Sequence, residues 1–302
     1  MRRSAPTANP QPVEEFRCAS DPESFDAVRI PQRRLVLLDG TAPHIVDPEI
    51  PGARDSIINL GECLNEPAMR PRLSPIRACM ADNAACSRRA RACLAAAAAL
   101  ARENAAILQS AADTERLFRM TQALTQAVLV PSAPTESAPS MRPVITEAMT
   151  PKGEISLIAE NAQPRVIRLL FHWGMDGTPV LRQLSAAARA AGYSTEEHLC
   201  PTVPGRLLHV GIPALSTLVT TSEQLTAEQT FDFAACIPRG ALLRHECALE
   251  QGRAGIQLHL HRAGAALAQA KELHDELESF YVPNMDFAKW QTILDRTLES
   301  LK

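Results

Sequence analysis

Two stretches of this chain carry the same pattern at a constant offset of 182 residues, and no other feature limits its possible folds as strongly. The first covers residues 13–38 and the second covers residues 195–220. Seven positions are identical without a gap, whereas about two would match by chance at average amino-acid usage. The identical residues of the first stretch are Glu14, Glu15, Cys18, Pro22, Val28, Ile30 and Pro31. This pattern indicates a duplicated structural unit.

Each copy has the pattern of two strands followed by helices. Residues 35–38 form a continuous apolar run, which is typical of a buried parallel strand. Spacing and propensity predict helices over roughly 75–110 and 113–129 in the first copy. In the second copy they predict helices over 241–280 and 287–301, with Pro283 between them. The helical parts match weakly at an offset of 173, which aligns Asp113 with Asp286.

A strand, a glycine turn and a helix stand ahead of the repeated stretch in the second copy. Residues 165–173 are predicted to be a buried strand, and residues 181–192 have helical spacing. This is the context of a phosphate loop, in which backbone N–H groups and a helix N-terminus hold an anion. The second copy is therefore expected to form a parallel sheet from residues 166–171, 195–199 and 215–219.

The turn itself is an incomplete phosphate loop. A working loop reads G-x-x-x-x-G-K-[ST], with a lysine for the outer phosphates and a hydroxyl for Mg²⁺. Here Gly174 and Gly177 are followed by Thr178 and by Pro179, which removes a backbone donor. These residues alone favour an ordinary strand-to-helix turn, and the alternative is a degenerate phosphate loop built on Gly174, Gly177 and Thr178.

The first copy is predicted to open at its second strand. The offset would place the preceding strand, turn and helix before Met1, which leaves unpaired sheet edges and an apolar face. A late assigned start, a decaying gene and coverage by the second copy each account for this, and the abrupt match at Val13 favours sequence divergence. We expect residues 1–12 to be disordered and the first copy to be less stable than the second.

Several long motifs of the chain resemble those of a known protein family. Their residues are 16–26, 38–44, 51–61, 149–153, 273–278 and 281–287. They resemble a two-repeat P-loop ATPase family of Firmicutes, within the P-loop containing nucleoside triphosphate hydrolases. The resemblance covers nearly the whole chain after residue 12. It implies an α/β fold with P-loop NTPase-like parallel sheets in two tandem repeats, each with a helical excursion, and it implies ATP binding.

This resemblance divides the chain into four segments. Residues 1–12 are the N-terminus, 13–129 a truncated first repeat with a helical hairpin, 130–148 a Pro/Ser-rich linker, and 149–302 the second repeat with its C-terminal helices. The chain departs from the family at both loops, since the first is missing and the second is degenerate. ATPase activity is therefore in question.

Two residues of the first copy are candidates for the chemistry of such a family. Asp39 ends the apolar run, where a carboxylate suits a Walker-B-like role that holds Mg²⁺ through water. A strand-ending Asp39-Gly40 turn is the alternative, and the resemblance favours the Mg²⁺ site. The second copy has Thr221 at that position. His44 lies in the same loop beside the expected nucleotide, although a lone loop histidine is more often structural.

Cysteine and histidine patterns favour packing over a metal. Cys79, Cys86 and Cys93 recur every seven residues on one helix face, which small core positions explain better than a redox or metal stripe does. A metal site from His245, His259, His261, Cys236 and Cys247 is the less favoured alternative, because His259 and His261 diverge on a helix and no C-x-x-C pair supports zinc.

Composition excludes several partners. The net charge of −3 and an aromatic content of 4% argue against nucleic acid, and no secretory signal or membrane-spanning run is present, so a cytoplasmic location without membrane contact is expected. The sequence leads to a degenerate P-loop NTPase-like protein whose binding of ATP and Mg²⁺ is weak or lost. The alternative is a non-catalytic protein-interaction module that acts through its helical excursions.

Overall fold

The computed structural model describes residues 13–41, 45–129 and 138–301, which form two compact units. Unit 1 comprises residues 1–87 and 267–302, and unit 2 comprises residues 88–266. The long helices α2 (Leu73–Ala111) and α5 (Arg239–Tyr281) each contribute to both units. Each compact unit therefore contains residues from both sequence copies.

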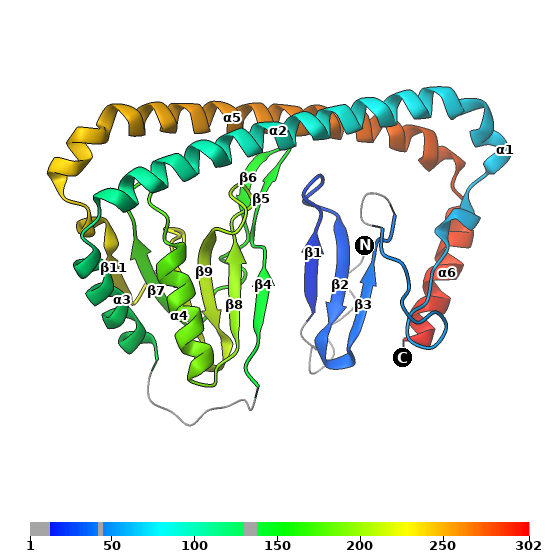
Figure 1. The fold of residues 1–302 in the computed structure, drawn as a ribbon. Coiled ribbons are helices and arrows are strands. Elements are labelled where there is room, and N and C mark those ends of the chain that lie inside the picture. The colour runs from blue at the N-terminus through cyan, green and yellow to red at the C-terminus, as the bar shows by residue number, and fades with distance from the viewer. Residues whose placement is uncertain (1–12, 42–44, 130–137, 302) are drawn as a thin grey trace. The chain divides into compact units, whose positions relative to one another are not determined.

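Unit 1 holds a three-stranded antiparallel sheet in the order β1-β2-β3 (Figure 1). Its strands are β1 (Glu14–Arg17), β2 (Phe25–Ile30) and β3 (Leu35–Leu38), with η1 (Pro31–Arg33) between the last two. The remaining elements are helical: η2 (Leu60–Cys63), α1 (Glu66–Met69), η3 (Arg70–Arg72), parts of α2 and α5, η6 (Val282–Asn284) and α6 (Phe287–Ser300).

The prediction of a buried parallel strand over residues 35–38 is wrong in the direction of pairing and in burial. β3 pairs antiparallel with β2, and its side chains alternate between half-buried and exposed. The reason is that no parallel neighbour lies beside β3 among the described residues of unit 1.

Unit 2 holds a six-stranded mixed sheet in the order β11-β7-β10-β9-β8-β4 (Figure 1). Its strands are β4 (Met141–Val144), β7 (Arg165–Leu170), β8 (Thr195–Leu199), β9 (Leu207–Ile212), β10 (Thr217–Thr220) and β11 (Gln229–Asp232). A separate hairpin consists of β5 (Glu147–Thr150) and β6 (Gly153–Ser156). The helices are α3 (Thr114–Val128), α4 (Thr178–Ala190), η4 (Pro213–Leu215) and η5 (Phe233–Cys236), with parts of α2 and α5.

The α/β class is confirmed, and the expected parallel sheet is confirmed only in part. β7 pairs parallel with β10, while β9 pairs antiparallel with both β10 and β8. The three predicted strands therefore run in one direction, and β9 runs against them. Only η4 joins β9 to β10, and so short a connection reverses the chain rather than crossing over. β4 lies within the expected linker, as an edge strand that tolerates Pro143.

The repeated stretch folds in the same way in both copies. Every pairing of β1 with β2 and of β2 with β3 recurs 182 residues later in β8, β9 and β10, including a bulge after Phe16 and after His198. Arg34 and Ser216 end η1 and η4 with left-handed backbone, at φ of 52° and 48°.

The helical parts also correspond, at the offset of 173. Asp113 caps α3 and Asp286 caps α6. The Asp113 N–H donates to the carbonyl of Cys236 in η5, and the Asp286 N–H donates to that of Cys63 in η2, both at 2.8 Å. The two copies thus exchange their terminal helices: α3 comes from the first copy and packs in unit 2, and α6 comes from the second copy and packs in unit 1.

The main core of unit 2 lies between α4 and the sheet (Figure 1). Leu181, Leu184 and Ala188 of α4 are fully buried against strand residues such as Ile167 and Val210, as the helical spacing predicts. Within the described residues, no helix combines the length and apolarity that a membrane crossing needs.

Candidate functional site

The turn between β7 and α4 joins the sheet to a helix at the edge where parallel strands end. β7 lies between β10 and β11, to both of which it is parallel. Gly174 adopts a φ of 86°, a conformation that favours glycine. A Cβ at Gly177 would come within 2.6 Å of the Phe171 ring, so this position also excludes a side chain. Both glycines are therefore required by the turn itself.

Asp176 occupies the anion position at the start of α4. Its Oδ1 accepts the backbone N–H of Thr178 at 2.9 Å. The Arg206 guanidinium lies 3.6 Å from the same carboxylate and donates to the carbonyl of Met175 at 2.6 Å. A carboxylate beside a helix N-terminus is stabilised by the helix dipole, as a phosphate would be. The chain therefore supplies its own anion and its own counterion here.

The Thr178 hydroxyl has a structural role. Its Oγ1 accepts the backbone N–H of Leu207 at 2.9 Å, and the side chain is buried. This bond ties the start of α4 to β9. In a working phosphate loop the hydroxyl after the lysine reaches Mg²⁺ instead.

A cavity of about 390 Å³ opens beside this turn in unit 2. Its wall includes the turn, the loop between β8 and β9, and the residues that follow β10. Apolar side chains dominate, and the polar exceptions include Arg206, Thr202, Thr221 and Glu223. In open α/β sheets, ligands bind outside the carboxyl ends of the strands, which is where this cavity lies.

The candidates from the first copy belong to the other unit. Asp39 ends β3 in a local turn, where its Oδ1 accepts the N–H of Thr41 at 2.9 Å and the Thr41 hydroxyl at 2.7 Å. The role of Asp39 at Mg²⁺ stays a prediction. His44 lies outside the described residues, as do residues 1–12. Gly174, Gly177 and Thr178 gather at the turn in unit 2, together with Thr221 of the cavity wall.

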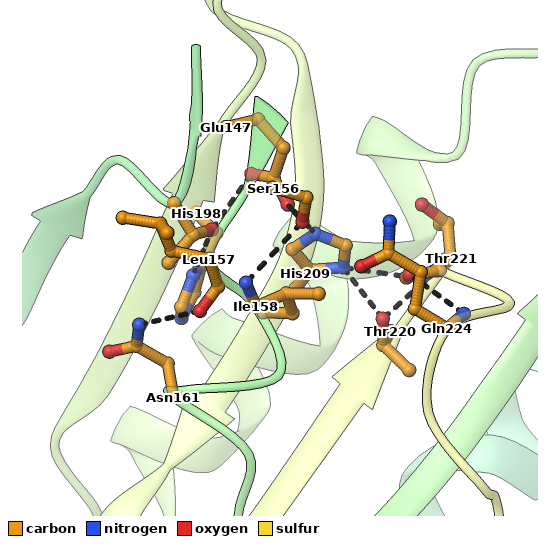
Figure 2. A network of polar contacts seen from close by, with 12 residues as sticks. Glu147, Ser156, Leu157, Ile158, Asn161, His198, His209, Thr220, Thr221 and Gln224 are labelled. Carbon is orange, nitrogen blue, oxygen red and sulfur yellow. Dashed lines mark hydrogen bonds and ion pairs between the residues drawn. The ribbon is translucent and has the colours of Figure 1, made fainter. Parts of the chain in front are cut away.

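A buried polar network that carries no sequence motif joins the β5–β6 hairpin to the sheet of the same unit (Figure 2). Glu147 Oε1 lies 2.9 Å from His209 Nε2, and the hydroxyls of Thr146 and Ser156 also donate to this carboxylate. On its other side, His209 Nδ1 lies 2.8 Å from the Thr220 hydroxyl. The Thr220 side chain is fully buried, so this relay orders the fold and offers no accessible nucleophile.

Burial sets the protonation of this network. Burial alone would raise the pKa of Glu147, but the hydrogen bond and charge of His209, with the two hydroxyl donors, lower it below its usual value. Burial and the neighbouring His209 lower the pKa of His198 to about 4. His198, whose Nδ1 lies 3.0 Å from the Thr146 hydroxyl, is therefore neutral at physiological pH.

The functional geometry depends on residues that carry little sequence signal. Asp176 stands two positions before the helix, which is a local turn pattern, but its partner Arg206 comes from another connection. His198 and His209 lie on neighbouring strands, and only the register between β8 and β9 brings them opposite each other.

Two of the three cysteines of the stripe on α2 are buried as the spacing suggests, and Cys93 is half-buried. Cys79 and Cys86 are buried, and the Cys79 thiol donates to the carbonyl of Leu273 at 3.0 Å. Across the described residues, no group of three or more His, Cys, Asp or Glu side chains is arranged to hold a metal ion.

Comparison with known proteins adds no relative on which an activity can be based. The chain matches no family model, no curated protein and no solved structure.

Proposed function

We propose that the cavity beside the β7–α4 turn is a degenerate nucleotide-type crevice and that this protein does not turn over nucleotide. One observation carries the proposal: the Asp176 carboxylate caps α4 where a phosphate would be held. A phosphate there would meet a fixed negative charge at close range. The missing lysine also removes charge stabilisation on which phosphoryl transfer depends.

Nucleotide binding tests the proposal directly. We expect MgATP to leave the thermal unfolding of the purified chain unchanged, whereas a ligand at 100 times its dissociation constant would stabilise it by about 2.7 kcal/mol. We also expect ATP hydrolysis no faster than in a buffer control. Hydrolysis that co-purifies with the chain and disappears in Asp39→Ala would overturn the proposal.

A charge-neutral variant sharpens the test. Asp176→Asn keeps an acceptor for the Thr178 N–H but removes the negative charge, so inorganic phosphate should stabilise this variant more than the native chain. Asp113→Asn is the matched control, since it neutralises another helix-capping carboxylate in the same unit. Equal responses of the two variants to phosphate would contradict the role assigned to Asp176.

A second candidate function is a non-catalytic interaction module that acts through the helical excursions. Large apolar side chains of the long helices are exposed, with Met80 at 53%, Leu243 at 61% and Leu258 at 54%. The phosphate response separates the two candidates, because stronger stabilisation of Asp176→Asn than of Asp113→Asn favours the degenerate crevice, whereas equal responses favour the module.

A further inference from the structure

The outer edge of β3 in unit 1 corresponds to an edge that is occupied in unit 2. β10, the counterpart of β3, pairs with β9 on one side and in parallel with β7 on the other. Among the described residues, β3 pairs with β2 alone. The Asp39 N–H donates to the Asp26 carbonyl at 2.8 Å. Since an antiparallel ladder alternates, the backbone groups of Val36 and Leu38 are directed toward the open edge.

Several apolar side chains of unit 1 are exposed where their counterparts in unit 2 are buried. Val36 is 48% exposed and Leu218 is 1% exposed, at the offset of 182. Phe25 is 49% exposed and its counterpart Leu207 is 1% exposed. Leu60 of η2 is 42% exposed, whereas Phe233 of η5, at the offset of 173, is fully buried. Exposed large apolar side chains at positions that are buried in the duplicate indicate a surface that another chain could cover.

Helix α6 of unit 1 shows the same difference from its counterpart. Its counterpart α3 buries Thr121, Leu124 and Val128, and it packs against α4. The equivalent positions on α6 are Leu294, Thr297 and Leu301, and all three are only half-buried. α6 buries no residue among those described. Among the described residues, this helix face therefore has no neighbour equivalent to α4 of unit 2.

We propose that unit 1 binds a strand–turn–helix segment of another polypeptide. The strand adds in parallel to the open edge of β3, and the helix packs on the sheet and on α6. Val36 and Leu38 form the acceptor edge for the strand, and the helix packs on Phe25, Leu60 and Leu294, since Leu207 and Phe233, the counterparts of Phe25 and Leu60, belong to the core beneath α4. The inference goes beyond the proposed function, because it concerns the other unit and needs no nucleotide.

The duplicated fold also sets the chemistry of the occupant. In unit 2 the strand has apolar side chains on both faces, with Val166, Ile167 and Leu169 buried, and the helix has one apolar face. The Arg165 guanidinium at the start of β7 donates to the carbonyl of Ala127 at the end of α3, at 2.8 Å. The equivalent end of α6 is Ser300, where the exposed Glu299 adds a negative charge. The occupant should therefore be an apolar strand that begins with a basic residue, followed by an amphipathic helix.

A synthetic peptide of this chain's own residues 164–192 serves as the probe. Added to the full chain, it should slow amide hydrogen exchange at residues 35–38 and in α6, and leave residues 217–220 unchanged. The same peptide with Ile167→Pro is the control, since proline cannot pair as a central strand. Strand addition through backbone hydrogen bonds is an established mode of peptide recognition.

A variant of the acceptor edge tests the geometry. Val36→Pro removes an N–H that points away from β2, so the sheet should stay folded while peptide affinity falls about tenfold. Leu294→Asp places a charge on the α6 face and should weaken binding without touching the strand edge. Circular dichroism of each variant reports whether the fold is kept.

Three results would overturn the proposal. One is the absence of protection at residues 35–38 up to the solubility limit of the peptide. Another is protection of residues 217–220 instead, which would mean that the peptide enters unit 2 in place of β7. The third is a dimer of the chain alone that Val36→Pro abolishes, because the edge would then pair with a second copy. None of these results depends on whether ATP binds.

Discussion

At the scale of single residues, the most constrained chemistry lies in the buried network of unit 2. His198 is 2% exposed, lies edge-on to His209 at a ring distance of 5.6 Å, and shares the Thr146 hydroxyl with Glu147. A buried polar side chain must keep its partners or destabilise the fold. This network therefore links the β5–β6 hairpin to the sheet at the cost of sensitivity to acid.

His198 should make the stability of unit 2 fall as the pH falls. Its pKa is about 4 in the folded chain and 6.5 ordinarily, so between these values the unfolded chain binds a proton that the folded chain does not. Full stability is present above about pH 6.5 and is lost toward pH 4, by about 3 kcal/mol in total. Urea unfolding at pH 7 and pH 4.5 measures this, and His198→Gln should reduce the difference.

His274 provides the matched control for this prediction. It is exposed on α5 and its Nε2 lies 3.3 Å from Glu278, so His274→Gln should leave the pH dependence of unfolding unchanged. An identical loss of stability on acidification in the native chain and in His198→Gln would mean that other groups cause it.

At the scale of elements, glycines bring α2 and α5 close together within unit 2. A Cβ at Gly252 would overlap the side chain of Asn104, and one at Gly255 would come within 2.7 Å of Leu100. Asn104 is 1% exposed and its Nδ2 lies 3.5 Å from the carbonyl of Leu249. The close approach of the two helices thus depends on the absence of side chains on α5.

Alanine at two glycines of α5 should have opposite effects. Gly252→Ala forces Asn104 to move and should lower the free energy of unfolding by about 1–3 kcal/mol. Gly264→Ala meets no atom within 4 Å, so it should raise that free energy by about 1 kcal/mol through helix propensity. Chemical denaturation of both variants measures the pair. A stabilising Gly252→Ala would show that α2 and α5 do not pack as described.

The helices could be predicted from the sequence better than the sheets. α2, α3, α5 and α6 begin and end within about two residues of the expected bounds, because spacing, caps and Pro283 are local signals. β11 and the β5–β6 hairpin were not predicted, since short strands depend on distant partners. The pairing of β11 illustrates this, because β7 is its only neighbour among the described strands. No described strand of unit 1 matches β7, and the residues of unit 1 equivalent to β11, 56–59, are not a strand.

The candidate site was predictable only in its local part. The glycine turn and its missing lysine are visible in the sequence at Gly174, Gly177 and Thr178. The counterion Arg206 and the buried Glu147 come from other connections and carry no motif. Their roles arise from tertiary packing, which periodicity does not encode.

At the scale of the whole molecule, the repeated strands of the two units differ in how far they are buried. In unit 2 the repeated strands are buried beneath α4 and beside β7. In unit 1 the same strands keep half of their apolar side chains exposed. Local stability follows buried apolar contact, so the units should differ although their strands pair identically.

Hydrogen exchange of the free chain should therefore rank the two units. The amides of β3 should exchange faster than those of β10, because among the described residues β3 has neither the parallel neighbour nor the helix cover of β10. Equal or greater protection of residues 35–38 would mean that the first copy is completed in a way that these contacts do not reveal.

The exchange of terminal helices also determines how the chain responds to cutting. A protease that cleaves between residues 129 and 138 separates the two copies. The first fragment then keeps α3, whose Asp113 N–H bonds to Cys236 in the second fragment, and the second fragment keeps α6, whose Asp286 N–H bonds to Cys63 in the first. The fragments should then migrate together in native electrophoresis and separate only in denaturant. A recombinant fragment of either copy alone would carry an α3 or an α6 with no η5 or η2 to dock on. To express unit 1 by itself, the distant segments 1–87 and 267–302 must be joined, whereas unit 2 is continuous from residue 88 to residue 266.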